Sequence, residues 1–200
     1  MRAVAAVLLT LAATAGCASG GGPAHGVPGA ASAGAPTAGA ASAGPTPAGA
    51  SAPGSAPAGS PAAATVMICA EEIREEIAGA LGTAPRSPLS PHWDGHVYWC
   101  AYDYGGGRSM RLSVEELPDR PTAASRFGRL RAAAAGSRTV RGLGDAAFAR
   151  GDGSAVALRD RMVLTVDVSR LPAVFGTPPR PRAGVALTVA TTVTICWKEH

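Results

Sequence analysis

The feature that most limits how this chain can fold is a long segment with almost nothing to bury. Between Ala18 and Thr65, every residue except His25 and Val27 is Ala, Gly, Pro, Ser or Thr. Such a segment cannot recover the entropy cost of ordering, because it has almost no charged, aromatic or large apolar side chains to pack. It therefore predicts a disordered linker, and the core has to come from the residues that follow.

The length of this linker sets how far it can hold a domain from the start of the chain. The reach of a flexible chain grows as about 5–6 Å × √n, which gives roughly 38 Å here, and more where proline stiffens the backbone. Residues 66–200 remain, and they are enough for a single domain with one core.

Residues 1–16 have the pattern of a lipoprotein signal peptide. Arg2 precedes an apolar run from Ala3 to Ala13, and small residues at 14–16 lead into Cys17. The run is too short to cross a bilayer core of about 30 Å as a helix, and it is typical of a cleaved export signal.

Cys17 is the expected lipidation site. Ala-Gly-Cys at the end of the apolar run is the lipobox order, although Thr14 stands where Leu is usual; an ordinary secretory signal with a chance cysteine is the alternative. Each buried CH₂ of an acyl chain contributes about 0.8 kcal/mol, so two or three chains give stable anchoring. The sequence thus predicts a chain held at the cell membrane by lipid, on the extracytoplasmic face.

Periodicity predicts the helices and strands of the domain. Apolar residues at every fourth position predict a helix over 70–81, and Asp119 is a plausible N-cap for a second helix through Ala135. Short alternating runs predict strands over 146–150, 155–159 and 162–168, with one face of the last strand in contact with water. Residues 183–198 fit either a strand or a helix, and their length favours the helix.

The clearest strand pair covers residues 97–104 and 108–115, joined by three glycines. If the glycines form the loop, the polar and apolar residues separate onto two faces, as a half-buried antiparallel pair requires. This register places Cys100 in the core, and it places Asp103, Ser109, Arg111 and Ser113 on the other face, with Trp99 among them. The predicted cross-strand pairs are Tyr104–Arg108, Tyr102–Met110, Cys100–Leu112 and Tyr98–Val114.

Several short motifs resemble those of a known group of proteins. They include the lipobox, the Ala/Gly/Pro/Ser tether, Ile68-Cys-Ala-Glu-Glu-Ile73, Tyr98-Trp-Cys-Ala-Tyr102, Gly142-Leu-Gly-Asp-Ala-Ala147 and Ile195-Cys-Trp197. With these motifs the chain resembles uncharacterised secreted lipoproteins of streptomycetes and related actinomycetes. The resemblance implies a small α+β domain, here expected as an antiparallel sheet of about five strands with two or three packed helices after a disordered stalk. It implies a C-terminal helix and carries over no catalytic residues.

With Cys17 lipidated, three cysteines remain, and each is predicted to face the core. A disulfide persists outside the cell and stabilises a small domain by about 2–4 kcal/mol. The favoured pair is Cys69–Cys100, which would join the first helix to the first strand; the rivals are Cys100–Cys196 and Cys69–Cys196. The remaining thiol is expected to behave as a small buried apolar side chain.

Metal and cofactor signals are weak. His92 and His96 share a four-residue spacing with Cys100, but Pro91 and Gly95 favour a loop there, so no metal site is assigned. The motif at 142–147 imitates a dinucleotide fingerprint without its strand–turn–helix context, so no cofactor is assigned. A net charge of +4 is far from a nucleic-acid footprint.

Surface candidates come from two sets of side chains. Trp99 and Tyr104 near the hairpin could line a recognition surface or pack in the core. A set of arginines could form a face for wall phosphates or lipid headgroups, or could be scattered in solvent: Arg108, Arg111, Arg126, Arg129, Arg131, Arg138 and Arg141.

These features predict a membrane-anchored lipoprotein whose domain is a non-catalytic binding or interaction module in the cell envelope. The expected partners are the membrane, an envelope protein or an anionic wall polymer, and not nucleic acid. A cell-envelope hydrolase is one alternative; it would need a pocket that joins His92 or His96 to Asp94 or Asp103 and to a nucleophile. An accessory or sensor subunit of a membrane protein is the other, and it would need an exposed apolar patch.

Overall fold

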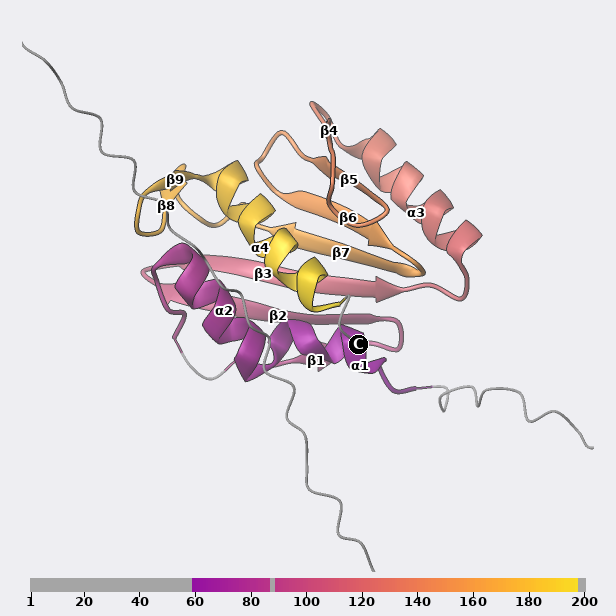
Figure 1. The fold of residues 1–200 in the computed structure, drawn as a ribbon, viewed down its shortest axis with the longest axis horizontal. Coiled ribbons are helices and arrows are strands. Elements are labelled where there is room, and N and C mark those ends of the chain that lie inside the picture. Colours follow the sequence, from indigo (N-terminus) through magenta and orange to yellow (C-terminus); the bar gives the residue numbers. More distant parts are fainter. Residues whose placement is uncertain (1–58, 87–88, 198–200) are drawn as a thin grey trace, which may run out of the picture. The chain divides into compact units, whose positions relative to one another are not determined.

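The computed structural model describes residues 59–86 and 89–197, which belong to one unit of the chain, Ser55–His200. The predicted signal peptide, Cys17 and most of the predicted linker lie outside the described residues. Figure 1 shows the order of the elements along the chain. The helices are α1 (Ala63–Val66), the 3-10 helix η1 (Met67–Cys69), α2 (Glu71–Leu81), α3 (Arg120–Ala133) and α4 (Arg182–Cys196).

An antiparallel sheet forms the centre of the domain, in the order β1-β2-β3-β7-β6-β5-β4. A separate hairpin pairs β8 (Val174–Phe175) with β9 (Arg180–Pro181). The strands of the sheet are β1 (His92–Trp93), β2 (Val97–Gly105), β3 (Arg108–Glu116), β4 (Arg138–Val140), β5 (Ala146–Ala149), β6 (Ala155–Arg159) and β7 (Met162–Asp167).

The domain is an α+β fold, as the sequence predicts, but the number of strands was wrong. The sheet has seven strands within the described residues instead of about five, and four α-helices stand where two or three were expected. The two extra strands of the sheet, β1 and β4, are two and three residues long. Runs this short carry no apolar alternation, so a period-two pattern cannot identify them.

The predicted β2–β3 pairing is confirmed except at the hairpin end. The pairs Tyr98–Val114, Cys100–Leu112 and Tyr102–Met110 are all present, and their side chains are buried. Arg108, however, pairs with Gly105 and not with Tyr104, because the register shifts by one residue after Asp103. Gly105 has a φ of 76°, a left-handed conformation that glycine adopts without strain, and it provides this bulge.

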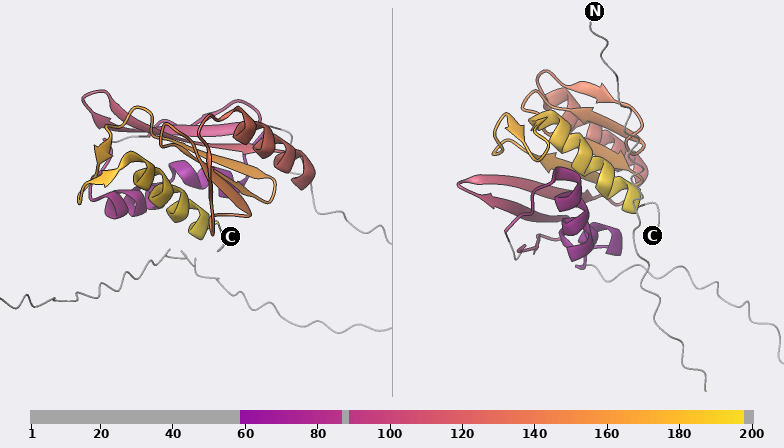
Figure 2. Two further views of the ribbon diagram at one scale, coloured as in Figure 1. Left: turned by 90° about the horizontal axis from the view of Figure 1, so that it is seen from above. Right: turned by 60° about the vertical axis from the view of Figure 1, so that its left-hand side comes forward.

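One face of the sheet is covered by α2 and α4, which Figures 1 and 2 show on the same side, and by η1, which contacts β2 and β3. The Tyr102 hydroxyl donates a hydrogen bond of 2.6 Å to the Ile68 carbonyl, which fixes η1 over β2. α4 packs against α2 and over β6 and β7. The buried side chains on this face include Cys100, Leu112, Val114, Leu164 and Val166.

The opposite face is covered by α3, but only over β5, β6 and β7. Phe127 of α3 meets Phe148 edge to face, with ring centroids 5.2 Å apart, and Val163 lies under the same helix. The sequence predicts a wet face for Val163, Thr165 and Asp167; this was wrong for Val163, which is 1% exposed because α3 covers it.

The three predicted helices are present and begin where the chemistry of the chain favours it. Asp119 accepts a hydrogen bond of 2.7 Å from the Thr122 backbone N–H, so it is the N-cap of α3. α2 buries Ile73, Ile77 and Leu81 on one stripe. Residues 182–196 form a helix, so the helical interpretation of the C-terminal segment is confirmed.

The chain enters the domain through contacts to distant elements. The Trp93 indole N–H donates to the Gly59 carbonyl at 2.7 Å, and the Ala62 backbone N–H donates to the Glu116 carboxylate at 2.7 Å. Thr65 is fully buried, and the Trp197 indole N–H donates to the Ala64 carbonyl at 2.8 Å. The described structure thus begins inside the segment that composition assigns to the linker.

Candidate functional site

The half of the sheet that α3 leaves uncovered carries the most distinctive side chains of the domain. It lies on the α3 side of β1, β2, β3 and the end of β7. We call it the open half-face, and its residues are His92, Trp99, Ala101, Ser109, Arg111 and Asp167.

Trp99 is held between two neighbours on this surface. His92 stacks on the indole with ring centroids 4.1 Å apart and an interplanar angle of 14°. The Arg111 guanidinium carbon lies 3.8 Å from the ring centroid. Since His92 and Arg111 come from the strands on either side of β2, and both lie about 4 Å from the ring, they must occupy opposite faces of the indole.

A shallow hollow of about 370 Å³ adjoins this stack. It has three charged side chains, and the two arginines are exposed. No side-chain hydrogen bond joins the Arg111 or Arg170 guanidinium to another described residue, which leaves the guanidinium donors available. The lining residues are Trp99, Ala101, Ser109, Arg111, Asp167, Ser169 and Arg170.

Asp167 is the anionic member of the hollow. Burial is the largest single influence and would raise the pKa of its carboxyl group. The hydrogen bonds from the backbone and side chain of Ser169 and from the Ser154 hydroxyl, together with the charge of Arg150, outweigh it. The net effect is a pKa below the ordinary value. The Ser154 hydroxyl and the Ser169 backbone N–H both donate to Oδ1, and Oδ2 has lone pairs that can accept from a ligand. At neutral pH the hollow therefore presents two cations beside one anion.

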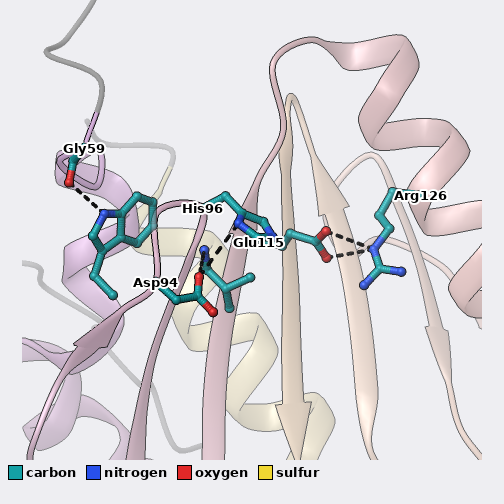
Figure 3. A network of polar contacts seen from close by, with 7 residues as sticks. Gly59, Asp94, His96, Glu115 and Arg126 are labelled. Atoms are coloured by element: carbon teal, nitrogen blue, oxygen red, sulfur yellow. Dashed lines mark hydrogen bonds and ion pairs between the residues drawn. The ribbon is translucent and has the colours of Figure 1, made fainter.

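An ion pair marks the border between the covered and open halves (Figure 3). The Nε–H of Arg126 on α3 is shared between both carboxylate oxygens of Glu115 on β3, at 2.8 and 2.9 Å. This contact fixes the position of α3 on the sheet and thereby sets the edge of the open half-face.

The residues that a hydrolase would need are not brought together. His96 and Asp94 lie in the turn before β2 with 3.8 Å between Nδ1 and Oδ1, and both side chains are 62% exposed (Figure 3). The Val97 backbone N–H holds the Asp94 carboxylate and lowers its pKa. His92 belongs to the Trp99 stack, and Asp103 lies at the other end of β2.

Cys69 and Cys100 lie at disulfide distance, with their Cα atoms 5.9 Å apart, so the pair favoured by the sequence is the one found. Cys196 is buried in α4 and takes no part in this bond. The bond lies on the α2 side of the sheet, away from the open half-face. Within residues 59–86 and 89–197, no group of three or more His, Cys, Asp or Glu side chains could hold a metal ion.

The other candidate surface residues are dispersed. Tyr104 is buried against Phe175 on the α2 side, so only Trp99 of the two aromatic candidates reaches the open half-face. Among the arginines, Arg126 pairs with Glu115, Arg131 donates to the Thr139 hydroxyl, and Arg108 donates to backbone carbonyls of the β2–β3 turn. The set is therefore not one face.

The loop at 142–147 is not a phosphate cradle, because the strand β5 follows it and no helix begins there. Its Asp145 carboxylate instead accepts a hydrogen bond of 2.7 Å from the Asp160 backbone N–H. A further hollow of about 390 Å³ lies at the end of α3, against Arg150 and Asp152. The carbonyl end of a helix disfavours anions there.

Asp167, Ser169 and Arg170 were missed by the sequence analysis as site residues. Their place in the hollow depends on the pairing of β3 with β7, strands about fifty residues apart in the chain. The alternation in β7 did place Asp167 on the solvent side, which was the one available signal.

None of the helices among the described residues is long and apolar enough to span a membrane. Compared with protein-family models, with curated proteins and with solved structures, the chain matches none of them.

Proposed function

We propose that this chain is a membrane-anchored extracytoplasmic lipoprotein that acts as a non-catalytic binding module in the cell envelope. In this proposal Cys17 carries the lipid, the Ala/Gly/Pro/Ser-rich segment after it forms the disordered stalk, and the domain binds its ligand through the open half-face. The anchor rests on the signal-peptide and lipobox pattern of residues 1–17.

One observation carries the binding role. No helix among the described residues covers the stacked Trp99 and the exposed Arg111 of the open half-face, while α3 buries the other half of the same face. An aromatic ring and a guanidinium held in a fixed arrangement are side chains that recur at recognition surfaces. The dispersal of His92, His96, Asp94 and Asp103 gives no comparable support to hydrolysis.

The anchor is tested by the mass of the native protein. We expect the membrane fraction to contain a chain that begins at Cys17 and carries acyl groups. A Cys17→Ser variant should be released into the medium with an unmodified mass. A chain found in the cytosol, or a bare thiol at Cys17 in the membrane-bound form, would contradict the anchor.

The binding role is tested with the released Cys17→Ser chain, which retains the stalk and the domain. We expect it to sediment with isolated cell-envelope material, and an added Arg111→Gln substitution should abolish this retention. The matched control is Arg129→Gln, since Arg129 is an exposed arginine of α3 outside the open half-face. Equal retention of both variants would show that the open half-face is not the binding surface.

A further inference from the structure

The hollow on the open half-face has an arginine that is ordered before any ligand arrives. Arg111 lies flat against Trp99, with 3.8 Å between the guanidinium carbon and the ring centroid, and His92 supports the other side of the ring. A stacked guanidinium keeps its N–H groups at its edge, where they can donate two parallel hydrogen bonds to an oxyanion. This arrangement favours a carboxylate or a phosphate as part of the ligand.

A second feature shows that the ligand is more than an anion. Asp167 is the cross-strand partner of Arg111, its pKa is lowered, and the two side chains form no ion pair with each other. A carboxylate beside the anion site repels a bare anion, but it accepts hydrogen bonds from hydroxyl groups next to the anionic group. Ser109 and Ser169 add hydroxyl groups to the same lining.

The surroundings of the hollow disfavour other partners. β3 and β7 beneath it are internal strands with partners on both sides, so an extended peptide could not pair with either of them. The large apolar side chain of the hollow is Trp99, and His92 and Arg111 cover both faces of its ring. A partner helix or a lipid surface would need exposed apolar side chains that this hollow does not offer.

We propose that this hollow binds an acidic carbohydrate, a sugar unit that carries a carboxylate or a phosphate beside free hydroxyl groups. Arg111 and Arg170 bind the anionic group, and Asp167 with the serine hydroxyls binds the neighbouring hydroxyls. This inference rests on the proposed function, because it names the ligand class of the same surface.

The test is an NMR titration of the isotope-labelled Cys17→Ser chain with glucuronate and glucose 6-phosphate. Glucose is the neutral control, inorganic phosphate is the anion without a sugar, and phosphatidylglycerol vesicles represent a lipid surface. We expect both acidic sugars to shift the Trp99 indole N–H signal and to bind about tenfold more tightly than glucose or phosphate.

Two variants separate an acidic-sugar site from a simple anion site. Arg111→Gln should weaken binding of both acidic sugars by about tenfold, and Arg129→Gln should leave it unchanged. Asp167→Asn should weaken binding of the acidic sugars, because the carboxylate acceptor is lost, while binding of inorganic phosphate improves. A simple anion site would instead gain affinity for every anion in Asp167→Asn.

The inference is overturned if phosphate binds as tightly as the acidic sugars, or if the vesicles bind through Arg111 and the sugars do not. It is also overturned if Arg111→Gln abolishes retention on envelope material while no acidic sugar binds, a result that leaves the proposed function intact. Binding of the acidic sugars without retention on the envelope would support the site and contradict the proposed function.

Discussion

The two halves of one sheet face in this domain have opposite surroundings. Over β5, β6 and β7, α3 buries Phe148, Val156 and Val163 in an apolar layer. Over β1, β2 and β3, the same face carries the stack of His92, Trp99 and Arg111, and none of the helices that the structure describes covers it. Both halves belong to one hydrogen-bonded sheet, so the difference lies in the side chains. It teaches that one half of the face serves stability, while the other is available for binding.

The largest expected effect lies in the covered half. Phe148→Ala should lower the free energy of unfolding by about 3–5 kcal/mol, because it leaves a cavity under α3 and removes the contact with Phe127. Chemical denaturation measures this change. The matched aromatic residue on the open half is Trp99, and Trp99→Ala should cost only about 1 kcal/mol. Equal losses in the two variants would mean that the halves do not differ in their contribution to stability.

The disulfide beneath the open half should have the next largest effect. Replacing Cys69 and Cys100 together by serine should destabilise the domain by about 2–4 kcal/mol, since the bond constrains the unfolded chain. The loss can also be measured by comparing the denaturant unfolding of the native chain with and without a reductant. A double variant as stable as the native protein would show that the open half needs no covalent support.

Arg111→Gln tests whether the open half-face contributes little to stability. We expect the free energy of unfolding to fall by no more than about 1 kcal/mol, because the cation–π contact with Trp99 is open to solvent. Retention on envelope material should nevertheless be lost. If Arg111→Gln unfolded the domain as Phe148→Ala does, Arg111 would have to be a structural residue.

The smallest effect is a pH dependence at Asp167. Its pKa is lower in the folded than in the unfolded state, so the ionised form adds stability above the unfolded pKa of about 3.9. This contribution is lost as the pH falls through the lower, folded pKa. The difference in stability between the native chain and Asp167→Asn should therefore narrow as the pH falls below about 4. If the difference in the free energy of unfolding between the two chains grew as the pH falls, the lowered pKa of Asp167 would be contradicted.

Local patterns in the sequence predicted the elements that local chemistry controls. The cross-strand pairs of Tyr98, Cys100 and Tyr102 followed from alternation and a glycine turn, and the start of α3 followed from Asp119. The predicted register at the turn was wrong by one residue. Alternation cannot show which of the three glycines remains paired in the strand.

The open half-face could be predicted only in part. Trp99 and Arg111 were placed on the polar side of the β2–β3 pair, but their contact with each other was not anticipated. The position of α3 over Val163, and the meeting of Arg111 with Asp167, depend on long-range packing. Such packing leaves no periodic signal in a single sequence, because it is decided by which elements cover the sheet.

The entry of the chain into the domain has a mechanical consequence. A pulling force applied from the N-terminal side would act first on the hydrogen bonds at Gly59, Ala62 and Ala64. These single bonds can break one after another under weak force. Detachment of the chain would then stop at Cys69, because its disulfide bond transmits the force directly to Cys100 in β2. Under such a load the domain would lose α1, while the open half-face would keep its structure.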